Sequence, residues 1–391
     1  MNRIETRLLV AGTLLAGLVG ASAVIAQSND AAPDARYVMD AGTIAGMMGQ
    51  GDSHELTLRL GSRLAPTGAA KADHFMPAGA RLGASVPLET PVRSDEALPA
   101  NFQRPKGRLL LYWGCGAKAG PGQPVVVDFA RVAKGAMPPG LFSAKVPADL
   151  GPSLANSRSF GQWPNSLKSR SISAQSSLIG QHRVAGSYSP EIAFALDQDF
   201  MAGLRVRASA NPDGSTGISW QGIGNATGYH AWVMGGKDMG QNGGDMVWWS
   251  SSATQEFGGG LWSWLSPATV TKLIGQKIVM PPAQTSCVVP AEVKKAAGET
   301  MMGFVYAYGP EANFAFPERP RDPKIAWKPK WTAKVRYRSM GMFMPGMPGM
   351  SDMLGGRDEE AAGETPEAAK KKKCKPKGLG GMLKKAAGVG C

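Results

Sequence analysis

A row of basic side chains near the end of the chain is the pattern best suited to binding chemistry. Lys330, Lys334, Arg336 and Arg338 occupy even positions, and apolar or aromatic residues occupy the odd positions between them. Because successive side chains of a β-strand point to opposite faces, this alternation predicts a strand with one buried and one cationic face. Such a face suits a polyanion, for example lipid phosphates or acidic glycans. Outward cations also protect a sheet edge from aggregation, so both roles stay open.

A second group of cations lies nearer the C-terminus and consists of Lys370, Lys371, Lys372 and Lys373. It adds to a formal net charge of +13 and predicts attraction to an anionic membrane surface or cell wall, at about 1 kcal/mol per contact. Asp358 to Glu367 is acidic. The alternative is therefore a solvated tail that pairs with its own acidic neighbour.

Methionines recur every third residue after the basic row, at Met344, Met347, Met350 and Met353. Thioethers are soft ligands that select Cu(I) over harder ions, so this spacing raises copper handling as an alternative function. The alternative interpretation is that the methionine spacing arose by drift in a low-complexity segment rich in Gly and Pro, without a binding role. We expect no other cofactor.

The sequence contains no recognisable catalytic constellation. His54, His74, His182 and His230 are scattered, and neither an HExxH zinc motif nor a GxSxG nucleophile elbow is present. We therefore predict no catalytic residues and a protein that is not an enzyme. An envelope hydrolase with an unrecognised site is kept as a further alternative.

The N-terminus resembles an export signal. Arg3 and Arg7 precede an uncharged run from Leu8 to Ala26, after which polarity returns. A basic start, an apolar run and small residues before a polar segment predict a signal peptide at 1–26 and a periplasmic or envelope location. An uncleaved anchor is the alternative, because the run is just long enough to span a bilayer. We expect an anionic envelope component or another envelope protein as partner, and no nucleic acid.

Export changes the reading of the four cysteines, Cys115, Cys287, Cys374 and Cys391. In an oxidising compartment an even number permits disulfides, but four cysteines allow three pairings and the sequence does not choose among them. Cys115 with Cys287 would tie the two halves of the chain together, and free thiols remain possible.

Composition and patterning predict a mainly β chain, with alternating strands at Glu55–Leu60, where Leu56, Leu58 and Leu60 share one face, and at Met301–Tyr308. The 51 Gly and 29 Pro favour turns and short strands over long helices. We expect two β-sandwich-like domains with long loops and disordered termini. The predicted organisation is a signal peptide at 1–26, an extended lead-in at 27–50, a β-rich domain at 51–150, a Ser-rich linker at 151–189, a sandwich domain at 190–340 with an insert at 252–300, and a Met/Gly/Pro-rich, charge-blocked tail at 341–391.

One stretch supports the sandwich more specifically. Ile218 to Met234 reads as two alternating apolar runs around a short turn rich in Gly and Asn, with Trp220 before the turn and Tyr229 after it. This stretch resembles strands B and C of a fibronectin type III or related immunoglobulin-like module. The resemblance covers about residues 200–340 and implies a fold, not an activity. The long insert at 252–300 departs from the plain module.

Overall fold

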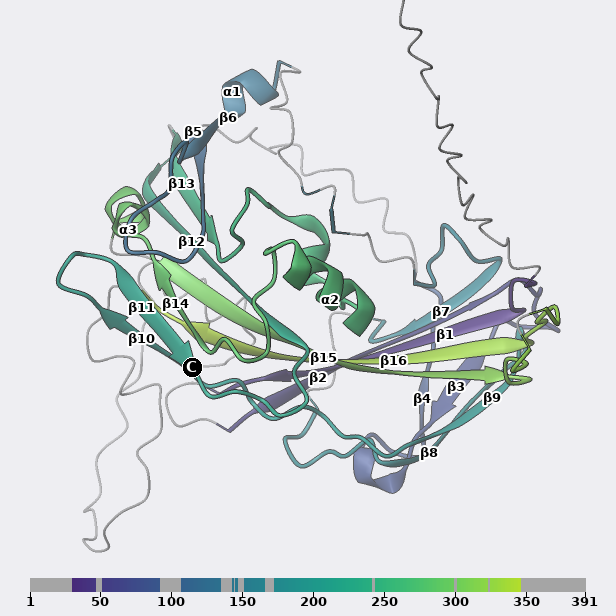
Figure 1. The fold of residues 1–391 in the computed structure, drawn as a ribbon. Coiled ribbons are helices and arrows are strands. Elements are labelled where there is room, and N and C mark those ends of the chain that lie inside the picture. Colours follow the sequence, from purple (N-terminus) through teal and green to yellow (C-terminus); the bar gives the residue numbers. More distant parts are fainter. Residues whose placement is uncertain are drawn as a thin grey trace, which may run out of the picture. The chain divides into compact units, whose positions relative to one another are not determined.

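Strand β16 (Trp331–Phe343), the strand that the alternation predicts, lies inside the largest sheet of the protein (Figure 1). The computed structural model describes residues 30–46, 51–91, 107–134, 143, 145–146, 151–165, 172–240, 243–298, 301–322 and 324–345. All of these residues belong to one compact unit within Met1–Gly355. Strands far outnumber helices in it, so the prediction of a mainly β chain is confirmed.

Three sheets contain the strands of the described residues. The largest has nine, in the order β6 (Val125–Asp128), β5 (Gly107–Trp113), β13 (Gly243–Ser250), β12 (Gly228–Gly240), β15 (Met301–Phe316), β16, β1 (Ala35–Ile44), β2 (Ser53–Ser62) and β7 (Ser159–Trp163). A four-stranded sheet has the order β4 (Ser85–Pro87), β3 (Ala72–Phe75), β8 (Gly180–Gly186) and β9 (Ser189–Leu196). A three-stranded sheet contains β10 (Val206–Ala210), β11 (Thr216–Trp220) and β14 (Ser286–Val289).

The two smaller sheets share a core with the large one. Val335 of β16, Ile192 of β9 and Ile218 of β11 belong to a single buried apolar cluster. Strand β16 contacts both β9 and β10, and Figure 1 shows the two smaller sheets near opposite ends of the long central strands. The arrangement is β-sandwich-like, as predicted.

Alternation along the central strands decides which side chains enter this core. Leu56, Leu58 and Leu60 of β2 are buried in it, as the sequence predicts. On β1 the corresponding residues are Tyr37 and Met39, which pair with Leu60 and Leu58. Residues of the opposite parity face the other side of the sheet, where the predicted basic row lies.

Two segments differ from the sequence prediction. The expected lead-in at 27–50 contains β1, which pairs with β16 and β2 in the middle of the large sheet. The expected linker at 151–189 contains all of β7 and β8. Both segments contain many small or polar residues, yet alternate residues such as Tyr37 and Val184 are fully buried. One apolar face is enough to order a strand inside a sandwich.

The predicted domain ranges also meet in one sheet. The nine-stranded sheet combines β2, β5 and β6, from 51–150, with β12, β13, β15 and β16, from 190–340. Two parallel pairings, β1 with β16 and β5 with β13, join strands that are distant in the chain. Such long-range pairing leaves no signal in local sequence patterns.

The insert at 252–300 covers part of the outer face of this sheet. It contains η2 (Gly259–Trp262), α2 (Pro267–Gly275), β14 and α3 (Ala291–Ala297); short helical turns elsewhere are η1 (Ala78–Ala80) and α1 (Phe129–Val132). Ser266 caps α2 by accepting a hydrogen bond from the Thr269 amide, and Pro267 occupies its first turn. Val270 and Leu273 of α2 then pack with Tyr308 of β15.

Strand β15 contains a bulge that changes which residues face the insert. Tyr308 pairs with Arg338, but Glu311 pairs with Arg336, so the register shifts by one residue between them. Before the shift the even-numbered residues of β15 lie on the outer face with Arg338. After it the odd-numbered residues do, and Glu311 joins the outer face.

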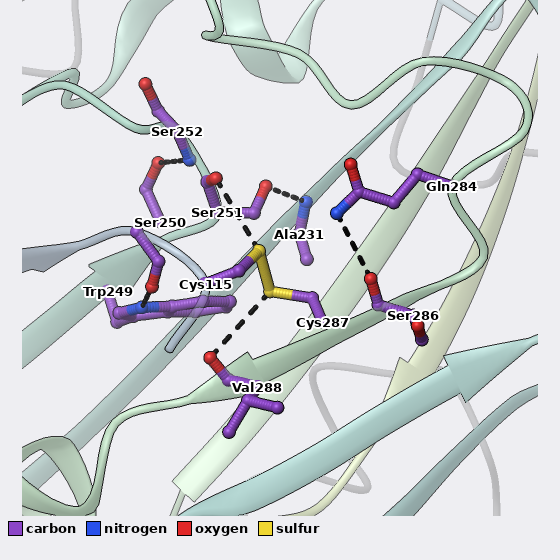
Figure 2. Close-up of a disulfide and its surroundings, with 11 residues drawn as sticks. Cys115, Ala231, Trp249, Ser250, Ser251, Ser252, Gln284, Ser286, Cys287 and Val288 are labelled. Carbon is purple, nitrogen blue, oxygen red and sulfur yellow. Dashed lines mark hydrogen bonds between the residues drawn. A yellow bond between two sulfur atoms is a disulfide. The ribbon is translucent and has the colours of Figure 1, made fainter. Parts of the chain in front are cut away.

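A disulfide joins the large sheet to the three-stranded sheet (Figure 2). Cys115 follows β5, and Cys287 lies in β14, with a Cα–Cα distance of 5.2 Å. Hydrogen bonds hold the same junction, including Trp249 Nε1 to the Gly114 carbonyl at 3.0 Å and the Gly116 amide to the Val288 carbonyl at 2.9 Å. Of the pairings left open by the sequence, this one is present; Cys374 and Cys391 lie outside the described residues.

Strands β11 and β12 are the two strands of the stretch that resembles a fibronectin type III module. They lie in different sheets, and the Trp220 and Tyr229 rings meet with centroids 5.3 Å apart. The family resemblance itself stays a prediction. In the part of the chain that the structure describes, no helix has the length and apolar character needed to cross a membrane.

Candidate functional site

The centre of the candidate site is a buried ion-pair group on the outer face of β16, β1 and β2. Arg336 donates to both oxygens of Asp40, at 2.6 Å from Nε and 2.8 Å from Nη2. Arg59 donates to the same carboxylate at 2.9 Å. The Asp40 and Arg336 side chains are only 2% and 8% exposed. A bidentate contact of this kind fixes the plane of the guanidinium.

The insert supplies the cover of this group. Arg336 Nη1 donates to the Trp264 carbonyl at 3.0 Å, and Arg338 Nη1 donates to the Trp262 carbonyl at 2.6 Å. The Arg338 guanidinium also lies over the Trp264 ring, 4.3 Å from its centroid, which adds a cation–π contact. The sequence predicted that all four cations of the row are exposed. In the structure two of them, Arg336 and Arg338, are buried under the insert.

Arg338 has a carboxylate partner from two strands away. Glu55 of β2 accepts from Arg338 Nη2 at 2.8 Å, across Gly42 of β1. An alanine at position 42 would place its Cβ against the Glu55 side chain. The missing side chain at Gly42 thus leaves the space through which Glu55 reaches Arg338.

Lys330 and Lys334 are the cations of the row that stay accessible, and Lys334 is the one that lies within β16. Its side chain is 40% exposed, and its ammonium group lies 3.0 Å from Glu311 Oε1. Asn313 donates to the same oxygen at 2.8 Å. The second oxygen, Oε2, is buried and has no hydrogen-bond partner among the described residues. The bulge in β15 is what brings Glu311 to this side of the sheet.

A polar pocket of about 330 Å³ lies over these side chains. Its charged lining consists of three cations, Arg36, Lys334 and Arg336, and one carboxylate, Glu311. The remaining lining residues are Tyr37, Val38, Gly151, Pro152, Ser263, Trp264, Leu265, Ser266, Thr269 and Thr332. Cations and hydroxyl groups converging on one cavity bind and orient an anion.

The structure brings together only part of the predicted site. Lys334 and Arg336 line the pocket, whereas Lys330 lies before β16, with its ammonium group 5.9 Å from the Phe316 ring centroid. Lys370, Lys371, Lys372 and Lys373 lie outside the described residues. Of the methionine ligands proposed for copper, Met344 is described and Met347, Met350 and Met353 are not. Among the described side chains, no group of three His, Cys, Asp or Glu residues is arranged to hold a metal ion.

Sequence reasoning missed the pocket residues outside β16. Arg36 lies on β1, which the sequence prediction read as a lead-in. Ser266 and Thr269 belong to the start of α2. The Ser-Pro pair before an apolar run is a recognised helix start and was the available signal for α2. For Arg36 the signal was the alternation of Ala35, Tyr37, Met39 and Ala41 around it.

A second polar constellation lies on the inner side of β1, between the large and four-stranded sheets. Tyr37 OH lies 2.5 Å from His74 Nδ1, and His74 Nε2 lies 3.0 Å from His182 Nδ1. His182 Nε2 lies 2.7 Å from the Leu178 carbonyl. A carbonyl only accepts, so His182 donates from Nε2, His74 donates to His182, and Tyr37 donates to His74. This order satisfies every group when both imidazoles are neutral.

Burial supports the neutral state of these histidines. It is the main cause that lowers the pKa of His74 well below its ordinary value, and the neighbouring His182 lowers it further. Burial also lowers the pKa of His182, and that of His230 to about 4. Desolvation disfavours the charged imidazolium in each case. We interpret these histidines as packing elements of the core.

The two constellations therefore differ in chemistry: the outer one offers cations to a pocket, and the inner one is closed and neutral. The chain matches no protein-family model and no curated protein, so the function rests on this geometry alone.

Proposed function

We propose that this chain is an exported cell-envelope protein with a binding role, which takes an anionic group in the pocket over β1 and β16. The observation that carries the proposal is the pocket lining, in which three cations face one carboxylate. A cavity of about 330 Å³ suits a phosphate, a small carboxylate or one acidic sugar residue of a longer glycan.

The pocket side chains have distinct parts in this binding. Arg336 is held by Asp40 and by the Trp264 carbonyl, and it contributes a fixed positive charge to the pocket lining. Lys334 is long, partly exposed and able to reach an anion that enters from solvent. Ser263, Ser266 and Thr332 supply hydroxyl groups for the remaining oxygens. Preorganised donors lower the cost of ordering on binding.

Isothermal titration tests this proposal with two probes, inorganic phosphate and glucuronate. The variant Lys334→Gln should weaken binding of at least one probe about tenfold, since it removes one charged donor. Lys330→Gln is the matched control, because Lys330 has the same chemistry but does not line the pocket. Absence of binding by both probes, or an equal effect of the two variants, argues against the pocket.

Export draws support from two features. The first is the N-terminal pattern at 1–26, and the second is the Cys115–Cys287 disulfide, since stable disulfides belong mainly to oxidising compartments. N-terminal sequencing of the protein from an envelope fraction should find Gln27 as the first residue. A full-length protein in the cytosolic fraction, with both thiols free, contradicts export.

The basic segment at 370–373 adds a tether to this proposal. Intact protein and a version that ends at Pro345, just after β16, are fractionated with low-salt and high-salt washes of the membrane and wall pellets. If only the intact form pellets and salt releases it, the segment is an electrostatic tether. If both forms stay soluble, the tether is wrong and the pocket alone defines the function.

A further inference from the structure

Strand β15 lies inside the large sheet for only half of its length. Its first part, Met301–Tyr308, pairs with β12 on one side and β16 on the other. Its last part, Glu311–Phe316, pairs with β16, and no described residue pairs with its other side. Alternate residues of a strand direct their N–H and C=O groups to that side, so this part is an open edge.

A cavity of about 620 Å³ follows this edge. Its lining residues are Ala193, Asn313, Phe314, Ala315, Phe316, Glu318, Arg319, Trp327, Trp331, Thr332, Ala333 and Lys334. Consecutive residues of β15 and of β16 are among them, although consecutive side chains point to opposite faces. Residues from both faces of the β15–β16 pair therefore line the cavity, beside the edge of β15 that no described strand pairs with.

The opposite wall comes from a second edge strand. Strand β9 pairs only with β8 among the described strands, and its Ala193 lines the cavity. Phe194, the next residue, stacks on Phe314 with ring centroids 5.0 Å apart. The cavity thus lies where the edges of two packed sheets meet.

The geometry points to an extended peptide of a partner protein as the occupant, added to β15 as a further strand with an apolar side chain in the cavity. Regularly spaced backbone donors and acceptors are matched by another extended backbone. Phe316, 53% exposed, and Trp327 offer aromatic walls for a side chain. A second copy of this chain would bring the same edge and the same cavity. Two such cavities facing each other would leave both unfilled.

Charge makes a smaller contribution at this edge than at the pocket over β1 and β16, which we propose binds an anion. Arg319 pairs with Asp30 at 2.6 Å, and Lys334 pairs with Glu311. The shape of the peptide side chain and the backbone ladder therefore select the partner. This inference does not depend on anion binding, although both cavities share Lys334 and Thr332.

The test uses fluorescent eight-residue peptides that alternate phenylalanine with threonine and end in two lysines or two glutamates. Two further versions carry N-methyl groups either on all phenylalanines or on all threonines. Strand addition predicts that one methylated version binds at least about tenfold more weakly and that the other retains its affinity, because only alternate amides face β15.

Protein variants locate the binding at the edge. Ala193→Phe places a large side chain at a position that lines the cavity and should weaken binding at least about tenfold, whereas Ala195→Phe should not, because Ala195 is exposed on the same face of β9 but does not line the cavity. Both variants should keep the phosphate or glucuronate affinity of the unchanged protein, or its unfolding midpoint if neither probe binds.

Three results overturn the inference. The first is that no peptide binds, and the second is that both methylated versions bind equally. The third is that Ala193→Phe removes a concentration-dependent dimer seen by sedimentation, which assigns the edge to a second copy. Failure of anion binding in the pocket leaves the inference unchanged.

Discussion

Strand β1 carries two buried polar constellations on its opposite faces, and they differ in charge. On the outer face Asp40 is shared between the guanidinium groups of Arg336 and Arg59, beside a pocket. On the inner face Tyr37 begins a chain of neutral imidazoles enclosed between two sheets. Buried charge is thus kept where a cavity opens to a ligand, and neutral hydrogen bonds are used where two sheets pack.

The largest expected effect comes from removing the carboxylate of the outer constellation. Asp40→Asn leaves two guanidinium groups without their shared partner, one of them almost fully buried. We expect the free energy of unfolding to fall by about 3–5 kcal/mol, as for other broken buried pairs. Urea denaturation measures it.

The matched control is Asp52→Asn, whose partner Arg205 is 46% exposed. Surface pairs contribute little, so we expect a change below about 1 kcal/mol. Equal losses in the two variants would show that the Asp40 group is not buried as described.

Acid should weaken the inner constellation. Its His74 and His182, and also His230 on β12, have lowered pKa values in the folded protein, mainly because they are buried. The unfolded chain then binds more protons, so stability falls as pH drops below about 6.5. For His230, whose pKa is lowered to about 4, the loss amounts to about 3 kcal/mol by pH 4.

Urea denaturation at pH 7, 6, 5 and 4 measures this slope. The double variant His74→Leu, His182→Leu should have a smaller slope, and Lys334→Gln, altered on the outer side, should keep the original one. A slope that is unchanged in the double variant would remove these histidines from the acid response.

A smaller effect is expected from Tyr37→Phe. The change removes the donor to His74 Nδ1 and leaves a buried acceptor unsatisfied, which costs about 1–3 kcal/mol. Tyr337→Phe is the control on the neighbouring strand, because its hydroxyl makes only a long bond of 3.3 Å to the Gln198 carbonyl. Although Tyr37 is among the pocket-lining residues, its hydroxyl lies with His74 on the inner side of β1, so phosphate and glucuronate binding should be unchanged in both variants.

The smallest effect is expected from Gly42→Ala. The new methyl group displaces the Glu55 side chain and breaks its pair with Arg338. Glu55 is 38% exposed and can turn into solvent, so we expect a loss of about 1 kcal/mol in the free energy of unfolding. Glu55→Gln gives the cost of the lost charge alone. A loss for Gly42→Ala that is no greater than for Glu55→Gln would show that space at position 42 is unimportant.

The sequence predicted those features of the structure that depend on local alternation of apolar and polar residues. Alternation identified β2 and β16 with their buried faces, and a strand around Met301–Tyr308. It did not reveal that Arg336 and Arg338 are covered. Their carboxylate partners lie 296 and 283 residues away in the chain, and the cover belongs to the insert.

The remaining errors have a common cause. Segments 27–50 and 151–189 contain many small and polar residues, which on average indicate poor burial. Tyr37, Val184 and Ser159 are nevertheless buried, because every second position faces a neighbouring sheet or strand. Composition averages the two faces of a strand, whereas packing uses each face separately.

The one-residue register shift at Gly309 and Pro310 gives a rule for reading relatives of this protein. Loss of one residue there would remove the bulge and leave Glu311 opposite Arg336, because one residue of each strand would then lie between the two pairs. The six residues that follow would keep their faces, so a single-residue gap at this point is tolerated. A homologue that lacks one residue between Glu311 and Asn313 would instead place Phe314 opposite Lys334, and it is expected to bind a different ligand.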